Sequence, residues 1–191
     1  MGALTVPFLI MATHKPVEIE ELYGSLNIVE PKNRWYVIHS KPRCEKKLAE
    51  FAQKYKICYY LPLRESTRHY KYRKIIFTKP LFPSYVFIKC NFDQKEFLYR
   101  SGCIVKILEV IDQKEFIEDL KQIYKGKEKG AELKPSQYLA NGQKVKIVKG
   151  PFIGLTGVVK KHRIVKEVIL QVNMLRQGVS VQVEPDQVKI L

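Results

Sequence analysis

In this 191-residue sequence, the residues whose types and spacing suggest a chemical function are lysines and arginines that alternate with aromatic residues. Between Arg64 and Lys79, six lysines and arginines stand against one acid, Glu65. Within this stretch, residues 69–74 (HYKYRK) alternate rings and charges, as proteins that bind single-stranded nucleic acid do. A twisted hairpin with a charged edge would show the same pattern, so both interpretations stay open. The candidate nucleic-acid-binding residues of this run are Lys71, Arg73 and Lys74.

The charge of the whole chain also points to a polyanionic partner. The sequence has 34 Lys and Arg against 19 Asp and Glu, a formal net charge of +15. The balance is −2 over residues 1–33, +11 over 34–140 and +6 over 141–191. A surplus of this size is most simply matched by nucleic acid. The 46% share of apolar residues is that of a folded soluble protein rather than a disordered chain.

Motifs of enzymes and metal sites are missing from the sequence. The four histidines have no neighbouring serine or cysteine nucleophile, and neither a G-x-S-x-G motif nor a phosphate-cradling glycine loop occurs. The cysteines are far apart and lack zinc-ligand spacing, so we expect reduced thiols packed as small apolar side chains. Reduced thiols fit the cytoplasm. We therefore expect a cytoplasmic protein with no enzymatic activity, no metal and no cofactor.

The pattern of apolar residues predicts an α+β domain over residues 34–124, after a flexible leader at 1–33. Strands are expected at 35–39, 57–61, 74–78, 84–90 and 104–110. A helix after Pro42 and a second long helix around residues 116–124 have apolar residues at helical spacing, and a short helix is expected at 93–99. The apolar run at residues 2–12 is too short to span a bilayer.

The C-terminal part of the sequence has a different pattern. Residues 125–140 are rich in Gly, Lys and Pro and are predicted to be a linker. Residues 141–191 contain five short alternating segments separated by glycine-containing turns, which predicts a small β-barrel. Gly150, Gly154 and Gly157 stand where positive φ angles or close backbone approach would favour glycine.

The strands of the first domain are apolar on both faces, although two amphipathic helices can cover only one face. The other face, with rings such as Tyr36, Tyr59 or Tyr60, Tyr85 and Phe87, would then be exposed to water. An exposed apolar patch of several hundred Å² usually marks a partner site. We therefore expect a docking face for a protein beside a basic face for nucleic acid.

Three motifs resemble those of the NusG transcription elongation factors. They are 34–37 (RWYV), 80–87 (PLFPSYVF, similar to a Phe-Pro-x-Tyr signature) and 145–159 (VKIVKGPFIGLTGVV, similar to a KOW motif). They occur in the order and spacing of the family. The PLFP form looks more like the specialised paralogues of the RfaH and UpxY kind. The resemblance implies an N-terminal α/β sandwich followed by a small SH3-like KOW barrel. Some relatives refold this second domain into a helical hairpin, but residues 167–183 are rich in Val, Ile and Gln, which favours strands and predicts the barrel here.

The resemblance also implies a non-enzymatic mechanism. In the family, the N-terminal domain docks on the clamp helices of RNA polymerase and suppresses pausing or termination, in specialised members at selected operons. The docking candidates carried over by motif position are Trp35, Tyr36, Pro80, Leu81, Phe82, Pro83, Tyr85 and Phe87.

Two further sets of candidates follow from the resemblance. For the non-template DNA strand they are Lys41, Arg43, Lys46, Lys47 and Arg100. For a protein partner of the KOW domain, in the family a ribosomal protein or Rho, they are Phe152, Met174 and Leu175. A monomer that does not bind membranes is expected. The alternative is a ribosome- or RNA-associated KOW protein that does not act on polymerase.

Overall fold

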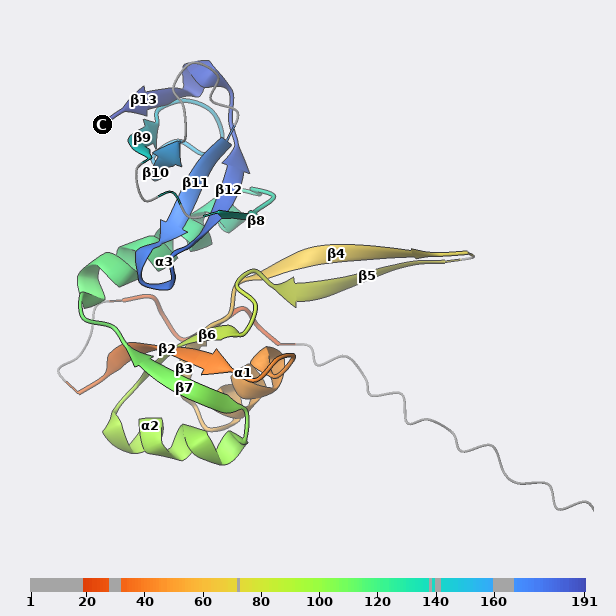
Figure 1. Cartoon of the computed structure of the whole chain (residues 1–191), viewed down its shortest axis with the longest axis vertical. Helices are drawn as coiled ribbons and strands as arrows, with labels where there is room; N and C mark the ends of the chain where they lie inside the picture. The colour runs from red at the N-terminus through yellow and green to blue at the C-terminus, as the bar shows by residue number, and fades with distance from the viewer. Residues whose placement is uncertain (1–18, 28–31, 72, 138, 140–141, 160–166) are drawn as a thin grey trace, which may run out of the picture.

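The computed structural model describes residues 19–27, 32–71, 73–137, 139, 142–159 and 167–191, and it divides into two units and a projecting arm (Figure 1). The N-terminal unit consists of β1 (Leu22–Tyr23), β2 (Arg34–Ser40), α1 (Glu45–Lys54), β3 (Cys58–Tyr60), β6 (Tyr85–Cys90), α2 (Phe92–Leu98), a 3-10 turn η1 (Tyr99–Ser101), β7 (Ile104–Glu109) and α3 (Gln113–Glu128). The arm is the hairpin of β4 (Leu63–Tyr70) and β5 (Arg73–Pro80). The C-terminal unit consists of β8 (Lys134–Gln137), β9 (Gln143–Ile147), β10 (Thr156–Val159), β11 (Glu167–Val172), η2 (Asn173–Leu175), β12 (Gln177–Gln182), η3 (Pro185–Gln187) and β13 (Val188–Ile190).

An antiparallel sheet in the order β1-β3-β6-β2-β7 forms the centre of the N-terminal unit. Alternation along the strands divides the core in two. Trp35 and Val37 point to one face, where Phe116 and Leu120 of α3 belong to the same apolar cluster. Ile38 points to the other face, where α1 and α2 pack. The predicted mixed α/β unit with strands and helices in this order is confirmed.

The prediction that one face of this sheet stays bare is wrong. The two long helices lie on opposite faces, because α1 packs with α2 whereas α3 covers the face that carries Trp35 and Phe87. The Phe87 and Phe116 rings meet edge to face with centroids 5.6 Å apart. At the start of α3, the Gln113 side chain accepts from the Trp35 amide and donates to the Trp35 carbonyl, at 2.8 and 2.9 Å. These contacts fix α3 on the sheet as part of the core.

The C-terminal unit is an antiparallel sheet in the order β13-β9-β10-β11-β12-β8. The five predicted strands are present, but the described strands do not hydrogen-bond β13 to β8, so a closed SH3-like barrel is not confirmed. The glycines act as the sequence predicts. Gly154 has a φ of +92°, and a Cβ on Gly157 would lie 2.6 Å from the Ile169 carbonyl oxygen of the neighbouring strand. Each position therefore favours glycine on backbone grounds.

The segment predicted as a linker is structured in its described part. Helix α3 continues to Glu128, and Lys134–Gln137 pair with β12 as strand β8. Part of the predicted leader is also structured, since Leu22 and Tyr23 pair with β3. Neither strand is marked by its own residues, because each is short and is added at a sheet edge by tertiary contacts.

The two units pack against each other through the outer side of α3 (Figure 1). Gly126 lies in this contact, where a Cβ would stand at ordinary van der Waals distances, 3.4 Å from Leu170 and 3.6 Å from Leu155. A glycine inside a helix costs about 1 kcal/mol relative to alanine. Gln122 of the same helix accepts from the Thr156 amide at 3.2 Å. Helix α3 is therefore covered on one side by the sheet and on the other by the C-terminal unit.

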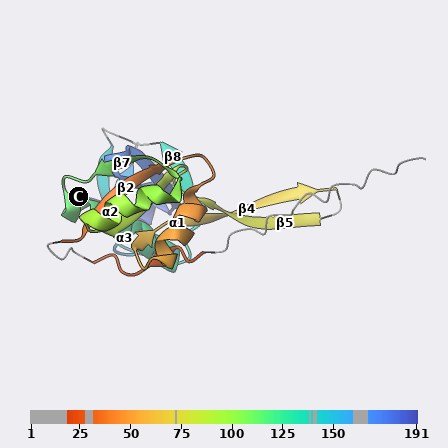
Figure 2. The same cartoon turned by 90° about the horizontal axis from the view of Figure 1, so that it is seen from below.

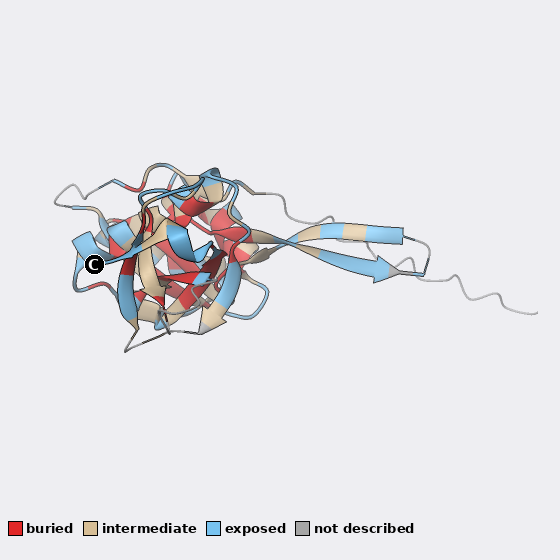
Figure 3. Ribbon diagram, turned by 90° about the horizontal axis from the view of Figure 1, so that it is seen from above, coloured by how far each residue is buried: buried red, intermediate tan, exposed pale blue. Residues whose placement is uncertain are grey.

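The arm projects far from both units, as two views at right angles show (Figures 1 and 2). Coloured by burial, most of its length is exposed (Figure 3). Its root is fastened to α1, where Lys46 donates to the Thr78 hydroxyl at 2.6 Å.

Candidate functional site

The turn between β5 and β6 carries most of the predicted docking residues. Leu81 and Phe82 are buried, at 1% and 2% exposure, and Phe82 packs on Phe87 with ring centroids 5.8 Å apart. Pro83 is exposed at the tip, and Tyr85 is half-buried and stacks on His39 at 5.2 Å. The turn therefore anchors itself with two apolar side chains and presents a proline and a tyrosine to solvent.

Ser84 holds this turn in an uncommon backbone conformation. Its φ is +65°, in the left-handed region that costs a non-glycine residue of the order of 1 kcal/mol. The Ser84 amide donates to Oε1 of Glu45 at 2.7 Å, and its carbonyl accepts from the Ser40 amide at 2.8 Å. Glu45 is a buried carboxylate at the start of α1, which the sequence analysis did not identify. Its bond fixes the direction in which Pro83 and Tyr85 project.

The eight predicted docking residues thus separate into two groups. Four are core side chains under α3 or in the anchored turn: Trp35, Leu81, Phe82 and Phe87. Four keep exposed surface: Tyr36, Pro80, Pro83 and Tyr85. Tyr36 lies on the opposite face of the sheet from Trp35, beneath the Lys95 ammonium at 4.8 Å.

Uncovering the core group would require α3 to leave the sheet. Four of its side chains, Phe116, Ile117, Leu120 and Ile123, are at most 2% exposed. At about 1.5–3 kcal/mol for each large apolar side chain, their exposure would cost about 6–12 kcal/mol. That range is comparable with the whole stability of a small domain. Of the predicted docking residues, those available to a partner without moving α3 are therefore Tyr36, Pro80, Pro83 and Tyr85.

The predicted basic patch at α1 is assembled by backbone contacts. The Lys41 amide donates to the Cys103 carbonyl at 2.8 Å, which brings the start of α1 beside the loop that follows Arg100. Arg43 has a φ of +63° and is exposed, as is Lys47. The Arg100 guanidinium lies over the Phe97 ring at 5.1 Å. Lys46 stands apart, because it bonds to the root of the arm.

Lys71, Arg73 and Lys74 lie at the far end of the arm and do not join the α1 patch. Antiparallel pairing sets Arg73 opposite Tyr70 and Lys74 opposite His69. Since successive strand residues alternate between faces, Arg73 and Lys74 belong to opposite faces of the ribbon.

The three predicted partner residues of the C-terminal unit, Phe152, Met174 and Leu175, are all half-buried against its core. Phe152 and Pro151 line a cavity of about 360 Å³, and Ile153 beside them is 54% exposed. Met174 instead lines a cavity of about 430 Å³ against the start of α3, together with Ile111 and Phe116. The loop with Met174 therefore faces the N-terminal unit.

Asn173 joins this loop to α3. Its amide donates to Oδ2 of Asp119 at 3.0 Å and its side chain to Oε1 of Glu115 at 2.8 Å. Burial raises the pKa of Asp119 to about 7, with smaller contributions from Glu115 and Glu118, whereas the Asn173 amide opposes the rise. Asp119 and Asn173 also line a second cavity of about 310 Å³, to which Lys144 of β9 contributes. Burial at this interface therefore disfavours the ionised form of the Asp119 carboxyl group.

Asp119 predicts a pH dependence of stability. Because its pKa is raised in the folded chain, the unfolded chain holds fewer protons between pH 4 and 7, and stability falls as the pH rises through this window. Replacement Asp119→Asn removes the charge and keeps an oxygen acceptor for the Asn173 amide. We expect the variant to be more stable than the parent at pH 8 by about 2 kcal/mol, allowing for partial exposure, and equally stable at pH 4. Urea unfolding at both pH values measures this difference, and an equal gain at both would contradict the assignment.

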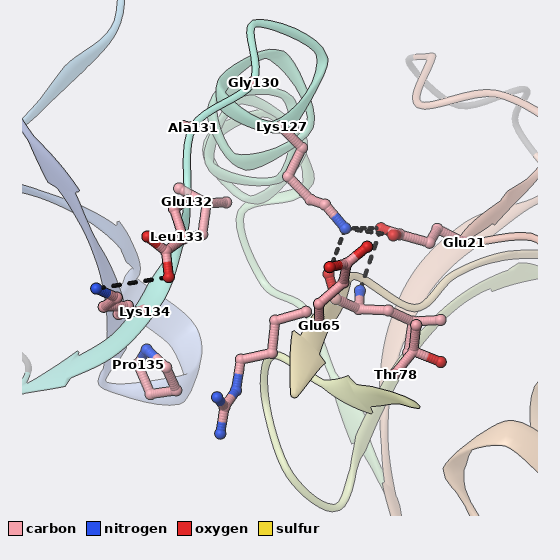
Figure 4. A pocket seen from close by; sticks show the side chains of 12 residues that line it. Glu21, Glu65, Thr78, Lys127, Gly130, Ala131, Glu132, Leu133, Lys134 and Pro135 are labelled. Carbon is pink, nitrogen blue, oxygen red and sulfur yellow. Dashed lines mark hydrogen bonds and ion pairs between the residues drawn. The ribbon is translucent and has the colours of Figure 1, made fainter. Parts of the chain in front are cut away.

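A cavity of about 790 Å³ lies between the root of the arm, the end of α3 and β8 (Figure 4). Lys127 bonds to the Glu21 carboxylate and to the Leu63 carbonyl across it. Glu65 and Glu132 also line the cavity, so its charge is mixed. Such a lining does not attract a polyanion, and we assign this contact a structural role between the two units.

The described residues contain no cluster of three or more His, Cys, Asp or Glu side chains that could hold a metal ion. Burial raises the pKa of Cys90 to about 12, so this thiol is protonated at neutral pH. In the part of the chain that the structure describes, no helix is both long and apolar enough to cross a membrane.

Comparison with known proteins identifies the family. The family model described as "Transcription termination factor nusG" matches residues 33–135. No curated protein matches the chain. A solved chain described as "Crystal Structure of MjSpt4:Spt5 complex conformation B" is similar at 19% identity and a TM-score of 0.28, covering 82% of this chain and 96% of that chain. Because the family model spans more than half of the sequence, the chain belongs to the NusG family of transcription factors.

Proposed function

We propose that this chain is a transcription elongation factor that binds RNA polymerase through the Pro83–Tyr85 end of the β5–β6 turn and suppresses pausing or termination at selected operons. Family membership supports the transcriptional role. The observation that carries the docking site is the conformation of Ser84, which Glu45 holds at a positive φ so that Pro83 and Tyr85 face solvent. Backbone strain of this kind is often retained at functional sites.

The α1 basic patch gives the factor its second contact. Lys41, Arg43, Lys47 and Arg100 are exposed, and we assign them to the non-template DNA strand of the transcription bubble. Lysine and arginine contacts to phosphates provide affinity that depends on salt and position the protein without reading sequence. Glu45 begins the same helix, so the docking turn and the patch share one support.

The C-terminal unit offers a third surface, near Phe152. The cavity that Phe152 and Pro151 line is open to a protein partner, for which a ribosomal protein or Rho is our candidate. Met174 and Leu175 are weaker candidates, since their loop is held on α3 by Asp119 and Glu115.

Suppression of pausing follows from a difference in affinity. A factor that binds the active state of polymerase more tightly than the paused state shifts the balance by the ratio of the two affinities. A difference of about 1.4 kcal/mol shifts it tenfold.

Single-round transcription through a pause site tests this function. We expect the full chain to shorten the lifetime of the pause, and the variant Lys41→Glu/Arg100→Glu to shorten it less because its DNA contact is reversed. The matched control is Lys146→Glu/Lys189→Glu, which reverses two exposed and paired lysines of the C-terminal unit. A pause lifetime unchanged by the wild-type chain would contradict the proposal and favour a ribosome- or RNA-associated role.

A further inference from the structure

The arm formed by β4 and β5 has a basic face and an opposite face of different character. Pairing across the hairpin sets Arg64 opposite Lys79, Ser66 opposite Phe77, Arg68 opposite Ile75 and Tyr70 opposite Arg73. Side chains directly opposite in an antiparallel pair lie on the same face, and alternate residues share it. Four cations, Arg64, Arg68, Arg73 and Lys79, therefore gather on one face, which we call the basic face.

The arm's only acid lies on the other face. Glu65 pairs with Thr78, Thr67 with Ile76, and His69 with Lys74. Lys46 of α1 bonds to Thr78, so this second face is turned toward α1 at the root. The basic face thus carries four positive charges with no acid among its own residues.

Phe77 organises the cations of the basic face. The Arg68 guanidinium lies 5.4 Å from the centre of its ring and the Lys79 ammonium 5.1 Å. Cation–π contacts of this kind contribute about 0.5–1 kcal/mol at exposed sites. They hold two long side chains in place and occupy the ring that a nucleobase would otherwise stack on. The Phe77 ring is therefore arranged to hold cations that can contact phosphates rather than to stack a base.

We propose that the arm is a DNA-binding ribbon that contacts the phosphates of a duplex through its basic face. At about 3.4 Å per residue, eight-residue strands make an arm about 27 Å long. A two-stranded ribbon fits the major groove of B-DNA, which is about 12 Å wide. Its cations stand at the root, the middle and the tip, so they follow a regular polyanion. This site is distinct from the α1 basic patch and goes beyond the proposed polymerase contact.

Salt-dependent binding of the full chain to a 30-bp duplex, without polymerase, tests the proposal. Each cation that contacts a duplex phosphate contributes about −0.9 to the slope of log K against log salt concentration. We expect Arg68→Gln/Arg73→Gln to make this negative slope shallower by about 1.8. Between 50 and 200 mM salt, the double variant should therefore lose about tenfold less affinity than the wild-type chain.

Arg73 and Lys74 provide a matched pair, because they are adjacent, equally charged and on opposite faces. Arg73→Gln should make the slope shallower by about 0.9, whereas Lys74→Gln should leave it nearly unchanged. Thermal melting of each variant checks that the fold is intact.

Three results would overturn the proposal. Equal slope changes for Arg73→Gln and Lys74→Gln would show that cations on both faces of the arm contribute equally to duplex binding. Tighter binding of the chain to a 30-nt single strand of the same sequence than to the 30-bp duplex would show that the arm binds unpaired DNA. Competition by polyglutamate as effective as by duplex would point to an acidic protein surface. Because polymerase is absent, none of these results bears on the docking turn.

Discussion

Replacing Phe87 by alanine should lower the free energy of unfolding by about 3–5 kcal/mol. The Phe87 ring is fully buried between the sheet and α3, where Phe82 and Phe116 both meet it edge to face. Truncation removes these contacts and leaves a cavity that the rigid sheet and helix fill only in part. Urea unfolding followed by circular dichroism measures the loss.

The matched variant for this prediction is Pro83→Ala in the same motif. Pro83 is exposed, so its replacement should change the free energy of unfolding by less than about 1 kcal/mol. If Phe87→Ala melted like the wild-type chain, the burial of this face under α3 would be contradicted, and Phe87 would return to the set of docking residues.

Replacing Tyr85 by alanine should weaken binding to RNA polymerase by about 30-fold or more. Tyrosine at the centre of an interface often contributes 2 kcal/mol or more, and 1.4 kcal/mol corresponds to a tenfold change. Tyr85 is half-buried, its ring stacks on His39, and its backbone amide bonds to the Phe82 carbonyl at 3.2 Å. The ring is thus held ready for a partner at little entropic cost. The equilibrium constant is measured by titration of labelled core polymerase.

Tyr55→Ala is the control for Tyr85→Ala. Tyr55 is an exposed tyrosine, at 44%, at the end of α1, and its ring packs on Phe51 and Phe97 rather than on the docking turn. We expect this variant to bind polymerase as the wild-type chain does. An equal loss of affinity in both variants would mean that Tyr85 has no special part in docking.

The order of strands and helices could be predicted from the sequence because each is marked by its own residues. The alternation of Trp35, Val37 and Ile38 predicts a strand with two buried faces, and the structure confirms it. Gly154 and Gly157 mark the turns and close approaches of the C-terminal sheet. Both patterns depend on residues close together in the sequence, so the strands and turns that they predict are found in the structure.

The covering of the sheet could not be predicted in the same way. A helix with one apolar stripe shows that it packs on something, but its sequence does not say on which face. The outer contact of α3 could not be predicted either, since it includes polar residues such as Gln122 and Asp119, which do not form a second apolar stripe. Glycine in a lysine-rich segment favours a linker by composition, whereas here Gly126 lies inside α3 and faces Leu170 and Leu155.

The geometry of the candidate docking site could not be predicted from the sequence either. The motif at 80–87 marks the correct segment, yet its members differ in role: Leu81 and Phe82 anchor the turn, and Pro83 and Tyr85 face outward. The partner that fixes this geometry, Glu45, is 39 residues from Ser84 in sequence and belongs to another element. Only the folded chain brings these residues together.

Co-elution of the full chain with core RNA polymerase on size-exclusion chromatography tests the central claim most directly. We predict that wild-type and Tyr55→Ala chains elute with polymerase and that Tyr85→Ala elutes alone, although all three melt as folded proteins. A wild-type chain that is folded but never elutes with core polymerase would contradict the account.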